Sequence, residues 1–478
     1  MKLLFAASEG APYVKSGGLG DVMHGLPVEL ARQKGVEVAV FLPYYRSIKF
    51  SSDFDIEYIT SFATVLAWRQ VYTGLFKAVS RSRKLTYYFI DNEYYFNRDG
   101  LYGDYDDGER FAFFSKAVLE SLQHLNYYPD VIHCNDWQTA LLPVFLKAHF
   151  QFGEYQKIKT VFTIHNIEYQ GKMPDRFCHE ILGLDEGWFH VLQFGDCLNL
   201  MKGAIVTADK VTTVSRTYSF EILHSYFGHG LEGILKENQY KLCGITNGLD
   251  QDAFNPKKDP RLFLNYGPGD AEGKAANKRH LQERLGLELK EDVPIVAMIT
   301  RLVAHKGLEL VEFMSNQLMS LNIQFVVVGT GDARFEDAFR FMEYQYPGRV
   351  SANILFDSAL ASQVYAGADL FLMPSKSEPC GLSQLIAMRY GTVPIVRETG
   401  GLVDTVPPLN IETLEGRGFT FKLFNAHDMY YAVERAVQFY QNKPLWAKHV
   451  KNIMQINSGW QQPAREYLGL YGELTGQN

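Results

Sequence analysis

Two short stretches of this chain combine cations with glycines, residue types that bind phosphate groups. In KSGGLG (15–20), Lys15 precedes three glycines where an apolar run gives way to a helical pattern. In RLVAHKG (301–307), Arg301 and Lys306 lie five residues apart. Arg holds phosphate oxygens bidentately and Lys acts as a point charge, while glycines let a backbone approach an anion closely. Such groups suit a diphosphate that gains negative charge as it departs.

Each stretch also has a plain structural reading. The glycines match neither the dinucleotide pattern GxGxxG nor the P-loop pattern GxxxxGK followed by Ser or Thr. KSGGLG could be a turn with an exposed lysine, and RLVAHKG a solvated basic turn. Asp21 could simply cap the following helix or lie in its first turn.

Further polar residues follow predicted strands. Asp136, in HCNDWQT, could orient hydroxyls or act in acid–base chemistry, or it could cap the helix that begins near Trp137. His165, in TIHN, is accompanied by no HxH, HExxH or carboxylate cluster, which favours a hydrogen-bonding histidine over a metal ligand. Glu378, in SEPCGL, could accept hydrogen bonds from sugar or ribose hydroxyls.

Strand-like runs alternate with helical patterns in both halves of the chain, which predicts an α/β protein with two doubly wound parallel sheets. Ligands bind such sheets at the carboxyl ends of the strands, so we expect the polar residues above to line a cleft between two facing halves. The β-rich text between 55 and 91 is interpreted as an antiparallel insertion. The predicted strands are 2–8, 37–43, 130–136, 159–166, 241–248, 293–300, 323–329, 352–356, 369–374 and 392–397.

A chain of 478 residues exceeds what one hydrophobic core usually organises. We predict a first Rossmann-like domain at 1–249 and a second at 275–455. The polar segment 250–274, which carries Pro and Gly, is predicted to be a linker. The segment 456–478 is predicted to be helical and to pack back on the first domain.

Composition excludes several classes of protein. A net charge of −7 argues against a general binder of nucleic acid or anionic membrane. The five cysteines are odd in number and form no CxxC pair, so a disulfide framework or zinc site is not expected and a reducing cytosol is the predicted compartment. The apolar run at the N-terminus ends before Glu9, too early for a signal peptide, and no apolar run approaches the ~20 residues of a membrane span.

Eight motifs in order resemble the bacterial glycogen synthase and plant starch synthase family across essentially the whole chain: KSGGLGDV, HCNDWQT, TIHN, ITNGLD, RLVAHKG, GTGD, PSKSEPCGLSQL and VRETGGLVDT. The resemblance implies the GT-B glycosyltransferase architecture, with two Rossmann-like domains around a deep cleft. It implies that 1–249 forms the acceptor side and 275–455 the donor side. It implies transfer of glucose from a nucleotide sugar, usually ADP-glucose, to the nonreducing 4-OH of an α-1,4-glucan such as glycogen, with retention at the anomeric carbon. No metal or other cofactor is expected.

The resemblance also assigns roles. Lys15 and the Gly17–Gly18 turn would face the donor phosphates and sugar, and Arg301 with Lys306 would neutralise the departing nucleoside diphosphate. Asp136, His165 and Asn247 would line the glucose site. Glu378 and the turn at Cys380 and Gly381 would hold glucose hydroxyls. Backbone donors near the diphosphate would come from Thr399, Gly400 and Gly401. The residues expected to be catalytic are Lys15, Asp136, His165, Arg301, Lys306 and Glu378.

Four positions depart from the family pattern. Gln138 stands where a histidine is expected, His305 where glutamine is common, and Ser377 where an aromatic residue often precedes the acid. Ile386 stands where many other retaining GT-B enzymes carry a second glutamate, which fits the bacterial synthase branch.

Two alternatives remain open at this stage. One is another retaining GT-B enzyme, such as a sucrose synthase-like or maltose-forming transferase. The other is a catalytically silent glucan-binding or regulatory protein, against which the joint presence of Lys15, Arg301, Lys306 and Glu378 speaks.

Overall fold

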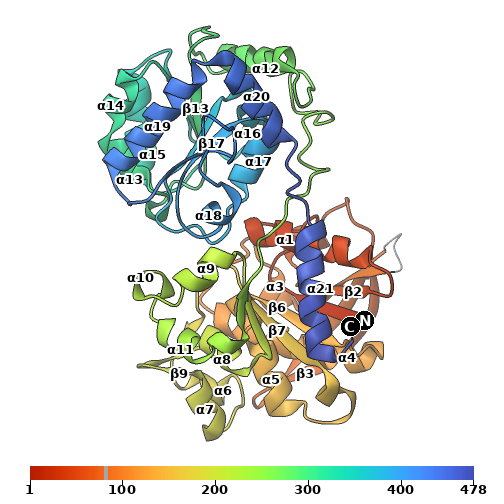
Figure 1. Cartoon of the computed structure of the whole chain (residues 1–478). Helices are drawn as coiled ribbons and strands as arrows, with labels where there is room; N and C mark the ends of the chain where they lie inside the picture. Colours follow the sequence, from red (N-terminus) through yellow and green to blue (C-terminus); the bar gives the residue numbers. More distant parts are fainter. Residues whose placement is uncertain (80–83, 478) are drawn as a thin grey trace. The chain divides into compact units, whose positions relative to one another are not determined.

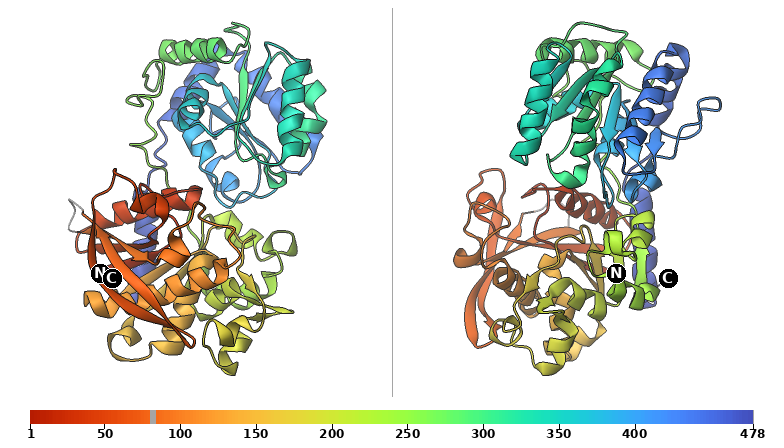
Figure 2. Two further views of the ribbon diagram at one scale, coloured as in Figure 1. Left: turned by 180° about the vertical axis from the view of Figure 1, so that it is seen from behind. Right: turned by 90° about the vertical axis from the view of Figure 1, so that its left-hand side faces the viewer.

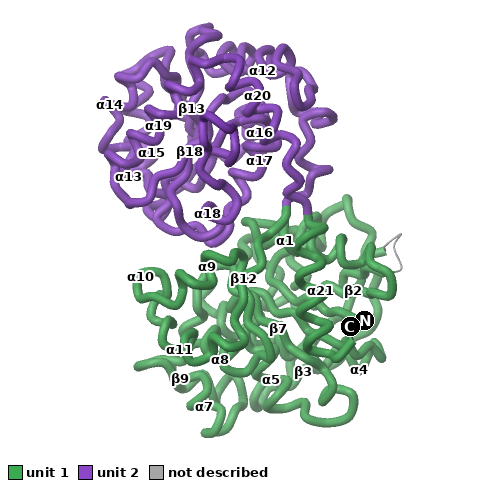
Figure 3. Tube along the Cα trace, in the orientation of Figure 1, with its two compact units in different colours: residues 1–248, 460–478 green, residues 249–459 purple. Residues whose placement is uncertain are grey.

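A computed structural model describes residues 1–79 and 84–477. The chain forms two compact units, each with its own hydrophobic core (Figures 1 and 3). The first unit comprises Met1–Gly248 and Trp460–Asn478, and the second comprises Leu249–Gly459. The fold is thus an α/β fold with one large sheet in each unit.

The first unit is built on a nine-stranded sheet in the order β12-β11-β7-β6-β1-β2-β5-β4-β3. The six strands from β12 to β2 are parallel. Chain order runs from β1 to β2 on one side and then to β6 on the other, so the strand order reverses between β1 and β6. Their bounds are β1 (Lys2–Ala6), β2 (Glu37–Pro43), β6 (Val131–Asn135), β7 (Lys159–Ile164), β11 (Lys210–Thr213) and β12 (Leu242–Gly244).

The predicted antiparallel insertion is only partly antiparallel. β3 (Ile56–Leu66) and β4 (Arg69–Ala78) form a hairpin, but β5 (Leu85–Asp91) pairs parallel with β2 as well as antiparallel with β4. β5 is therefore part of the central sheet, and the hairpin extends its edge. Residues 80–83 of the predicted insertion lie outside the described residues.

Helices cover the first sheet, and a small sheet in the order β8-β10-β9 lies beside it. Its strands are β8 (Lys172–Met173), β9 (Gln193–Phe194) and β10 (Cys197–Asn199). The α-helices are α1 (Gly18–Ala31), α2 (Arg46–Lys49), α3 (Glu93–Phe96), α4 (Asp107–Leu125), α5 (Leu141–His149), α6 (Phe177–Glu180), α7 (Glu186–Leu192), α8 (Leu200–Thr207), α9 (Arg216–Glu221), α10 (Ser225–Gly228), α11 (Glu232–Glu237) and α21 (Gln461–Thr475). The 3-10 helices are η1 (Trp137–Thr139), η2 (Gly153–Lys157) and η3 (Gln239–Lys241).

Helix α21 belongs to the first unit although it follows the whole second unit in the chain (Figure 3). Trp460, at its start, packs on α1 so closely that a Cβ on Gly25 would lie 1.9 Å from the indole Nε1. Farther along, the Tyr471 hydroxyl lies 2.7 Å from Nδ1 of the buried His133 on β6. The amphipathic segment at the end of the second half is therefore a structural part of the first core.

The second unit has a six-stranded parallel sheet in the order β15-β14-β13-β16-β17-β18, with helices on both faces (Figure 2). The strand order reverses between β13 and β16. Its strands are β13 (Ile295–Ile299), β14 (Gln324–Val328), β15 (Val350–Asn353), β16 (Leu370–Met373), β17 (Val393–Arg397) and β18 (Phe419–Phe421). Its helices are α12 (Ala271–Arg284), η4 (Ala304–Lys306), α13 (Leu308–Phe313), α14 (Ser315–Ser320), α15 (Ala333–Gln345), α16 (Ser358–Gly367), α17 (Ser383–Arg389), α18 (Gly401–Thr405), α19 (Ala426–Tyr440) and α20 (Lys443–Met454).

The segment 250–274, predicted to be a linker, belongs to the second unit. Tyr266 is buried in the second core and its hydroxyl donates to the carbonyl of Tyr390 at 2.6 Å. The hydroxyl of Tyr390 in turn donates to the buried Asp259 carboxylate at 2.6 Å. Polar composition suggested an exposed connection, whereas these side chains anchor the segment.

No helix within the described ranges is long and apolar enough to span a bilayer.

Candidate active site

The second unit places Lys306 and Glu378 together at the carboxyl ends of neighbouring strands. Lys306 ends η4 after β13, and Glu378 follows β16, so the two flank the reversal of strand order where such sheets bind ligands. The Lys306 ammonium donates to Oε2 of Glu378 at 2.8 Å. The hydroxyl of the buried Ser375 donates to the same oxygen at 3.0 Å. The pair is thus fixed from two sides.

Backbone contacts fix the loops that carry this pair. Gly307 has a positive φ of 73°, and a Cβ there would lie 2.1 Å from the carbonyl oxygen of Pro374. The Lys376 N–H donates to the carbonyl of His305 at 2.8 Å. From β17, the buried Arg397 donates through Nε to the carbonyl of Ser375 at 2.8 Å. The lysine and glutamate loops therefore form one rigid assembly.

The loop 399–401 closes the assembly from the next strand. A Cβ on Gly400, where φ is 47°, would lie 2.1 Å from the carbonyl oxygen of Glu378. The Gly401 N–H donates to the carbonyls of Glu378 at 3.1 Å and Pro379 at 3.2 Å. Thr399 is fully buried. These residues pack the glutamate loop, and the predicted use of the Gly401 N–H as an open diphosphate donor is not met in this structure.

A small cavity of about 50 Å³ lies beside the Lys306–Glu378 pair. Gly381 lines this cavity, and the preceding residue, Cys380, is buried. Arg301 is exposed at the end of β13 and is not among the lining residues. The cavity is lined by Met298, Ile299, Thr300, Lys306, Leu372, Met373, Pro374, Ser375, Glu378, Gly381, Leu382 and Ser383.

Phe356 is a candidate site residue that the sequence reasoning missed. Its side chain is 90% exposed, just beyond the carboxyl end of β15. The strand predicted at 352–356 included Phe356, whereas β15 (Val350–Asn353) ends three residues before it. An exposed phenylalanine at the ligand-binding edge of a sheet is a stacking surface for an aromatic base.

In the first unit, Lys15 lies in the loop after β1 and pairs with Asp21. The ammonium lies 2.7 Å and 2.9 Å from the two carboxylate oxygens, and both side chains are partly exposed. Asp21 is in the first turn of α1, while Gly17 is the N-cap and Gly18 the first helical residue. Asp21 is therefore a first-turn acid, one of the two plain readings of the sequence.

Asp136 follows β6 and adopts a positive φ of 58°, an uncommon conformation for a residue with a side chain. Its Oδ1 accepts the N–H groups of His165 at 2.8 Å and Asn166 at 3.2 Å. It does not cap η1 with its side chain, so the capping reading fails. The pKa of the carboxyl is raised from 3.8 to about 7, mainly because the group is buried. The two hydrogen bonds lower this pKa, and the Glu9 charge raises it. Such a group titrates near neutrality, as acid–base catalysts do.

His165 is held as one neutral tautomer. Its Nε2 lies 2.9 Å from Oδ1 of Asn135, whose Nδ2 donates to the carbonyls of Ala6 and His133 at 3.1 Å and 3.2 Å. Because Nδ2 is committed to carbonyls, Oδ1 must face the imidazole, and His165 must donate through Nε2. Burial lowers the pKa of His165 to about 3, so the ring is neutral at physiological pH.

Among the buried acceptors of the first unit that have no hydrogen-bond partner within the described residues are Oδ1 of Asn247 and Oε1 of Gln138. Both side chains are at most 9% exposed. A buried acceptor without a donor costs free energy unless a ligand or water satisfies it. Asn247 was predicted to bind the glucose, and Gln138 is a further candidate that occupies the position where histidine was expected.

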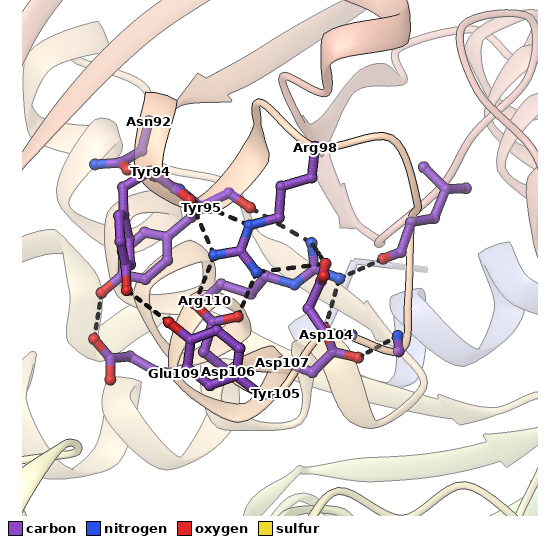
Figure 4. Close-up of polar contacts among 12 residues, drawn as sticks. Asn92, Tyr94, Tyr95, Arg98, Asp104, Tyr105, Asp106, Asp107, Glu109 and Arg110 are labelled. Carbon is purple, nitrogen blue, oxygen red and sulfur yellow. Dashed lines mark hydrogen bonds and ion pairs between the residues drawn. The ribbon is translucent and has the colours of Figure 1, made fainter.

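Figure 4 shows the ion network that orders the loop between α3 and α4. Arg110 is fully buried and donates to Asp107 at 2.6 Å and to the Leu101 carbonyl at 2.7 Å, while Arg98 pairs with Asp106. The network holds Tyr102, whose hydroxyl lies 2.7 Å from that of Ser8 at the end of β1. The loop therefore buttresses the segment that leads to Lys15.

No group of three or more His, Cys, Asp or Glu side chains within the described ranges is arranged to hold a metal ion.

Comparisons with known proteins place this chain in a family. The family model of the starch synthase catalytic domain matches residues 2–237, and that of the glycosyl transferases group 1 matches residues 282–442. A glycogen synthase of Clostridium botulinum is 48% identical over 479 residues, with 99% of this chain and 100% of the relative covered. This chain belongs to the glycogen and starch synthase family.

Other members of the glycogen and starch synthase family are similar to this chain along nearly its whole length. A glycogen synthase of Geobacillus thermodenitrificans is 48% identical, with 99% of this chain and 98% of that protein covered. The catalytic domain of Starch Synthase IV from Arabidopsis thaliana, solved bound to ADP and acarbose, is 34% identical with a TM-score of 0.91, covering 99% of each chain. Sucrose-phosphate synthase of Thermosynechococcus elongatus, at 18% identity, a TM-score of 0.62 and full coverage of both chains, shows the shared GT-B fold. The chain is therefore a glycosyltransferase of GT-B architecture.

Proposed function

We propose that this chain transfers glucose from ADP-glucose to the nonreducing 4-OH of an α-1,4-glucan, with retention of configuration and release of ADP. The observation that carries the proposal is the Lys306–Glu378 pair at the strand ends of the second sheet, in a chain that resembles glycogen synthases along its full length. The Arabidopsis starch synthase was solved with ADP and acarbose, a nucleotide and an oligosaccharide-like ligand, which supports both substrates.

Lys306 and Arg301 are proposed to bind the diphosphate. As the bond between C1 of glucose and the diphosphate oxygen breaks, negative charge gathers on the leaving group, and a positioned cation lowers the barrier. Lys306 is already oriented by Glu378, so it needs little reorganisation. Two such cations can do the work of a divalent ion, and we expect chelation of metals to leave the rate unchanged.

Glu378 is proposed to hold glucose hydroxyls rather than to attack the sugar. Its Oε2 already accepts from Lys306 and Ser375, and Ile386 occupies the position of the second glutamate of related enzymes. Retention then proceeds on one face of the sugar: the acceptor O4 forms its bond to C1 as the diphosphate leaves. The hydroxyl proton passes to the departing diphosphate oxygen.

Four residues of the first unit are proposed to bind substrate: Lys15, Asp136, His165 and Asn247. A neutral His165 with a fixed tautomer is suited to a hydrogen bond with a sugar hydroxyl, and Asn247 offers a buried acceptor. Lys15 is proposed to exchange Asp21 for donor phosphate, since a surface pair of this kind is weak. Gly17 and Gly18 have no side chains, so the backbone of this turn can be approached closely by a phosphate group.

Phe356 is proposed to stack on the adenine of the donor. Base stacking on an aromatic side chain contributes about 1–3 kcal/mol and tolerates different bases. The residue would therefore support nucleotide binding without alone deciding between ADP and UDP.

Initial rates with ADP-glucose and UDP-glucose on glycogen test the proposal. We expect radiolabelled glucose from ADP-glucose to enter glycogen as α-1,4-linked residues, with one ADP released per glucose. Product on fructose or sugar phosphate, and none on glucan, would instead support the sucrose synthase-like alternative. Glucan binding with no transfer from either donor would support a silent binding protein.

A further inference from the structure

Glu9 is a buried carboxylate that the proposed reaction does not use. It follows β1 by three residues and is 3% exposed. Carboxylates are rarely buried to this degree unless they are paired or hydrogen-bonded, because removal from water costs free energy. Its surroundings therefore show what it does.

The carboxylate of Glu9 lies against the turn that starts α1. Its Oε2 accepts the backbone N–H of Ser16, and its Oε1 lies 3.8 Å from the position that a Cβ on Gly17 would take. Gly17 is the N-cap of α1 and has no side chain to cap the helix. Ser16 precedes this N-cap, so Glu9 holds the backbone that leads into the helix, and its negative charge complements the helix dipole.

The turn held by Glu9 is folded closely on itself. The Ala11 N–H donates to the carbonyl of Gly20 at 3.0 Å, and the Gly10 N–H donates to the carbonyl of Val14 at 2.9 Å. A Cβ on Gly20 would lie 2.5 Å from the Cβ of Lys15, so the lysine side chain leaves the backbone directly over this glycine. The direction of Lys15 therefore depends on the shape of the turn.

We propose that Glu9 is a positioning residue for the donor site: its buried carboxylate holds the Lys15–Gly18 turn in shape. This inference rests on the proposed function for the role of Lys15 and Asp136. The geometric part, that Glu9 orders the turn, stands apart from it and can be tested without an activity assay.

The ionisable residues that interact with Asp136 include Glu9, His165, Tyr102 and Tyr218. The neighbouring His165 is neutral, since burial lowers its pKa to about 3. The neighbouring hydroxyls of Tyr102 and Tyr218 are also neutral, because burial raises the pKa of each above 10. The Glu9 charge raises the pKa of Asp136, so neutralising Glu9 should make Asp136 lose its proton at lower pH.

Two substitutions separate the hydrogen bond of Glu9 from its charge. Glu9→Gln keeps an oxygen that accepts the Ser16 N–H but removes the charge, while Glu9→Ala removes both. Glu29→Gln is the matched control, because Glu29 is a buried carboxylate of the same helix, paired with Arg32 at 2.9 Å and remote from the turn. Each variant is compared with the full chain by circular dichroism to confirm folding.

Amide hydrogen exchange of the peptide covering 10–22 is the readout that needs no substrate. We expect exchange at Ser16 and Gly17 to rise roughly tenfold or more in Glu9→Ala, to change much less in Glu9→Gln and to stay unchanged in Glu29→Gln. Unchanged exchange in a folded Glu9→Ala chain overturns the positioning role. Faster exchange in a chain that shows no glucosyl transfer in its parent form would leave that role intact and refute the proposed function.

Kinetics test the charge. We expect Glu9→Ala to raise the KM for ADP-glucose about tenfold, because displacement of a positioned group weakens binding. Glu9→Gln should keep the KM within about threefold of the parent and shift the pH dependence of kcat toward acid by roughly half a unit. The effect of the Glu9 charge on Asp136 is refuted if the pH dependence of kcat does not shift in Glu9→Gln. It is also refuted if the same shift occurs in Glu29→Gln.

Discussion

The ammonium of Lys306 and the carboxylate of Glu378 lie 2.8 Å apart across the point where the strand order of the second sheet reverses. Each residue comes from a different loop, and the two loops are joined by the bond from the Lys376 N–H to the His305 carbonyl. The lysine is thus oriented before any substrate binds, which is the condition under which a charge stabilises a transition state well.

Replacement of Lys306 by alanine should raise the activation barrier of turnover by about 2–4 kcal/mol, because the departing diphosphate loses a cation. The measurement is kcat on glycogen with saturating ADP-glucose. Lys290→Ala is the control: Lys290 also forms an ion pair, with Glu288 at 2.6 Å, but in an exposed loop before β13. A double-mutant cycle of Lys306→Ala and Glu378→Ala should be non-additive, since the residues are in contact. Additive losses would mean that the pair does not act as a unit.

Asp136→Asn should flatten the dependence of stability on pH. The folded protein raises the pKa of Asp136 from 3.8 to about 7, so the proton is bound more tightly in the folded than in the unfolded state. This contribution is fully present below pH ~4 and is lost as the pH rises through about 7. Urea unfolding across this range should show the parent losing roughly 2 kcal/mol relative to Asp136→Asn. Parallel curves for the two proteins would contradict the shift.

Asn135→Ala should lower kcat about tenfold with little change in the KM for ADP-glucose, since the tautomer and orientation of His165 would no longer be fixed. Nitrogen-15 shifts of the imidazole check the cause directly. The parent should show a protonated Nε2 at neutral pH, and the variant a mixture of tautomers. A single unchanged tautomer in the variant would show that Asn135 does not control the ring.

Phe356→Ala should weaken the binding of ADP-glucose by about 1–3 kcal/mol through loss of base stacking. The loss is measured as a rise in the KM for ADP-glucose. Phe356→Trp should restore affinity because it keeps an aromatic face. Phe341→Ala is matched as another exposed phenylalanine of the second unit, 58% exposed on α15, and should have no effect. Equal effects of both alanine variants would remove Phe356 from the site.

Gly307→Ala should destabilise the second unit by about 2 kcal/mol or more, because the new Cβ would meet the Pro374 carbonyl at 2.1 Å. Gly286→Ala isolates backbone strain: its φ of 68° is similar to the 73° of Gly307, but a Cβ there meets nothing within 4 Å. We expect that control to cost only about 1 kcal/mol. Thermal unfolding measures both, and similar losses would show that the clash relaxes.

The alternation of apolar strands and helices was enough to predict a parallel sheet in each half, because parallel strands buried on two faces read as continuous apolar runs. The short strands β11 and β18 were missed. Strand ends were less certain: the apolar letters of ANILF continue past Asn353, and the exposure of Phe356 depends on where the chain leaves the sheet. The prediction of an exposed linker at 250–274 failed for a related reason. Tyr266 and Asp259 are buried through long-range hydrogen bonds to Tyr390, which local composition does not encode.

Within the candidate site, the sequence identified the charged residues but not their partners. Lys306 and Glu378 were expected to meet a substrate, and their contact with each other follows only from the pairing of β13 beside β16. The Thr399–Gly401 loop was expected to donate to phosphate. A glycine needed for close packing and one needed for a ligand look alike in a sequence, and here Gly400 and Gly401 pack against the Glu378 and Cys380 backbone.

The contact between His133 and Tyr471 has a consequence for how the protein is made. Residues 249–459 lie between them in the chain and form a unit with its own core. During synthesis the ribosome must therefore complete the second unit before α21 exists to cover the first. The first unit can therefore complete its core only after the second unit has been translated, although most of its residues are made first.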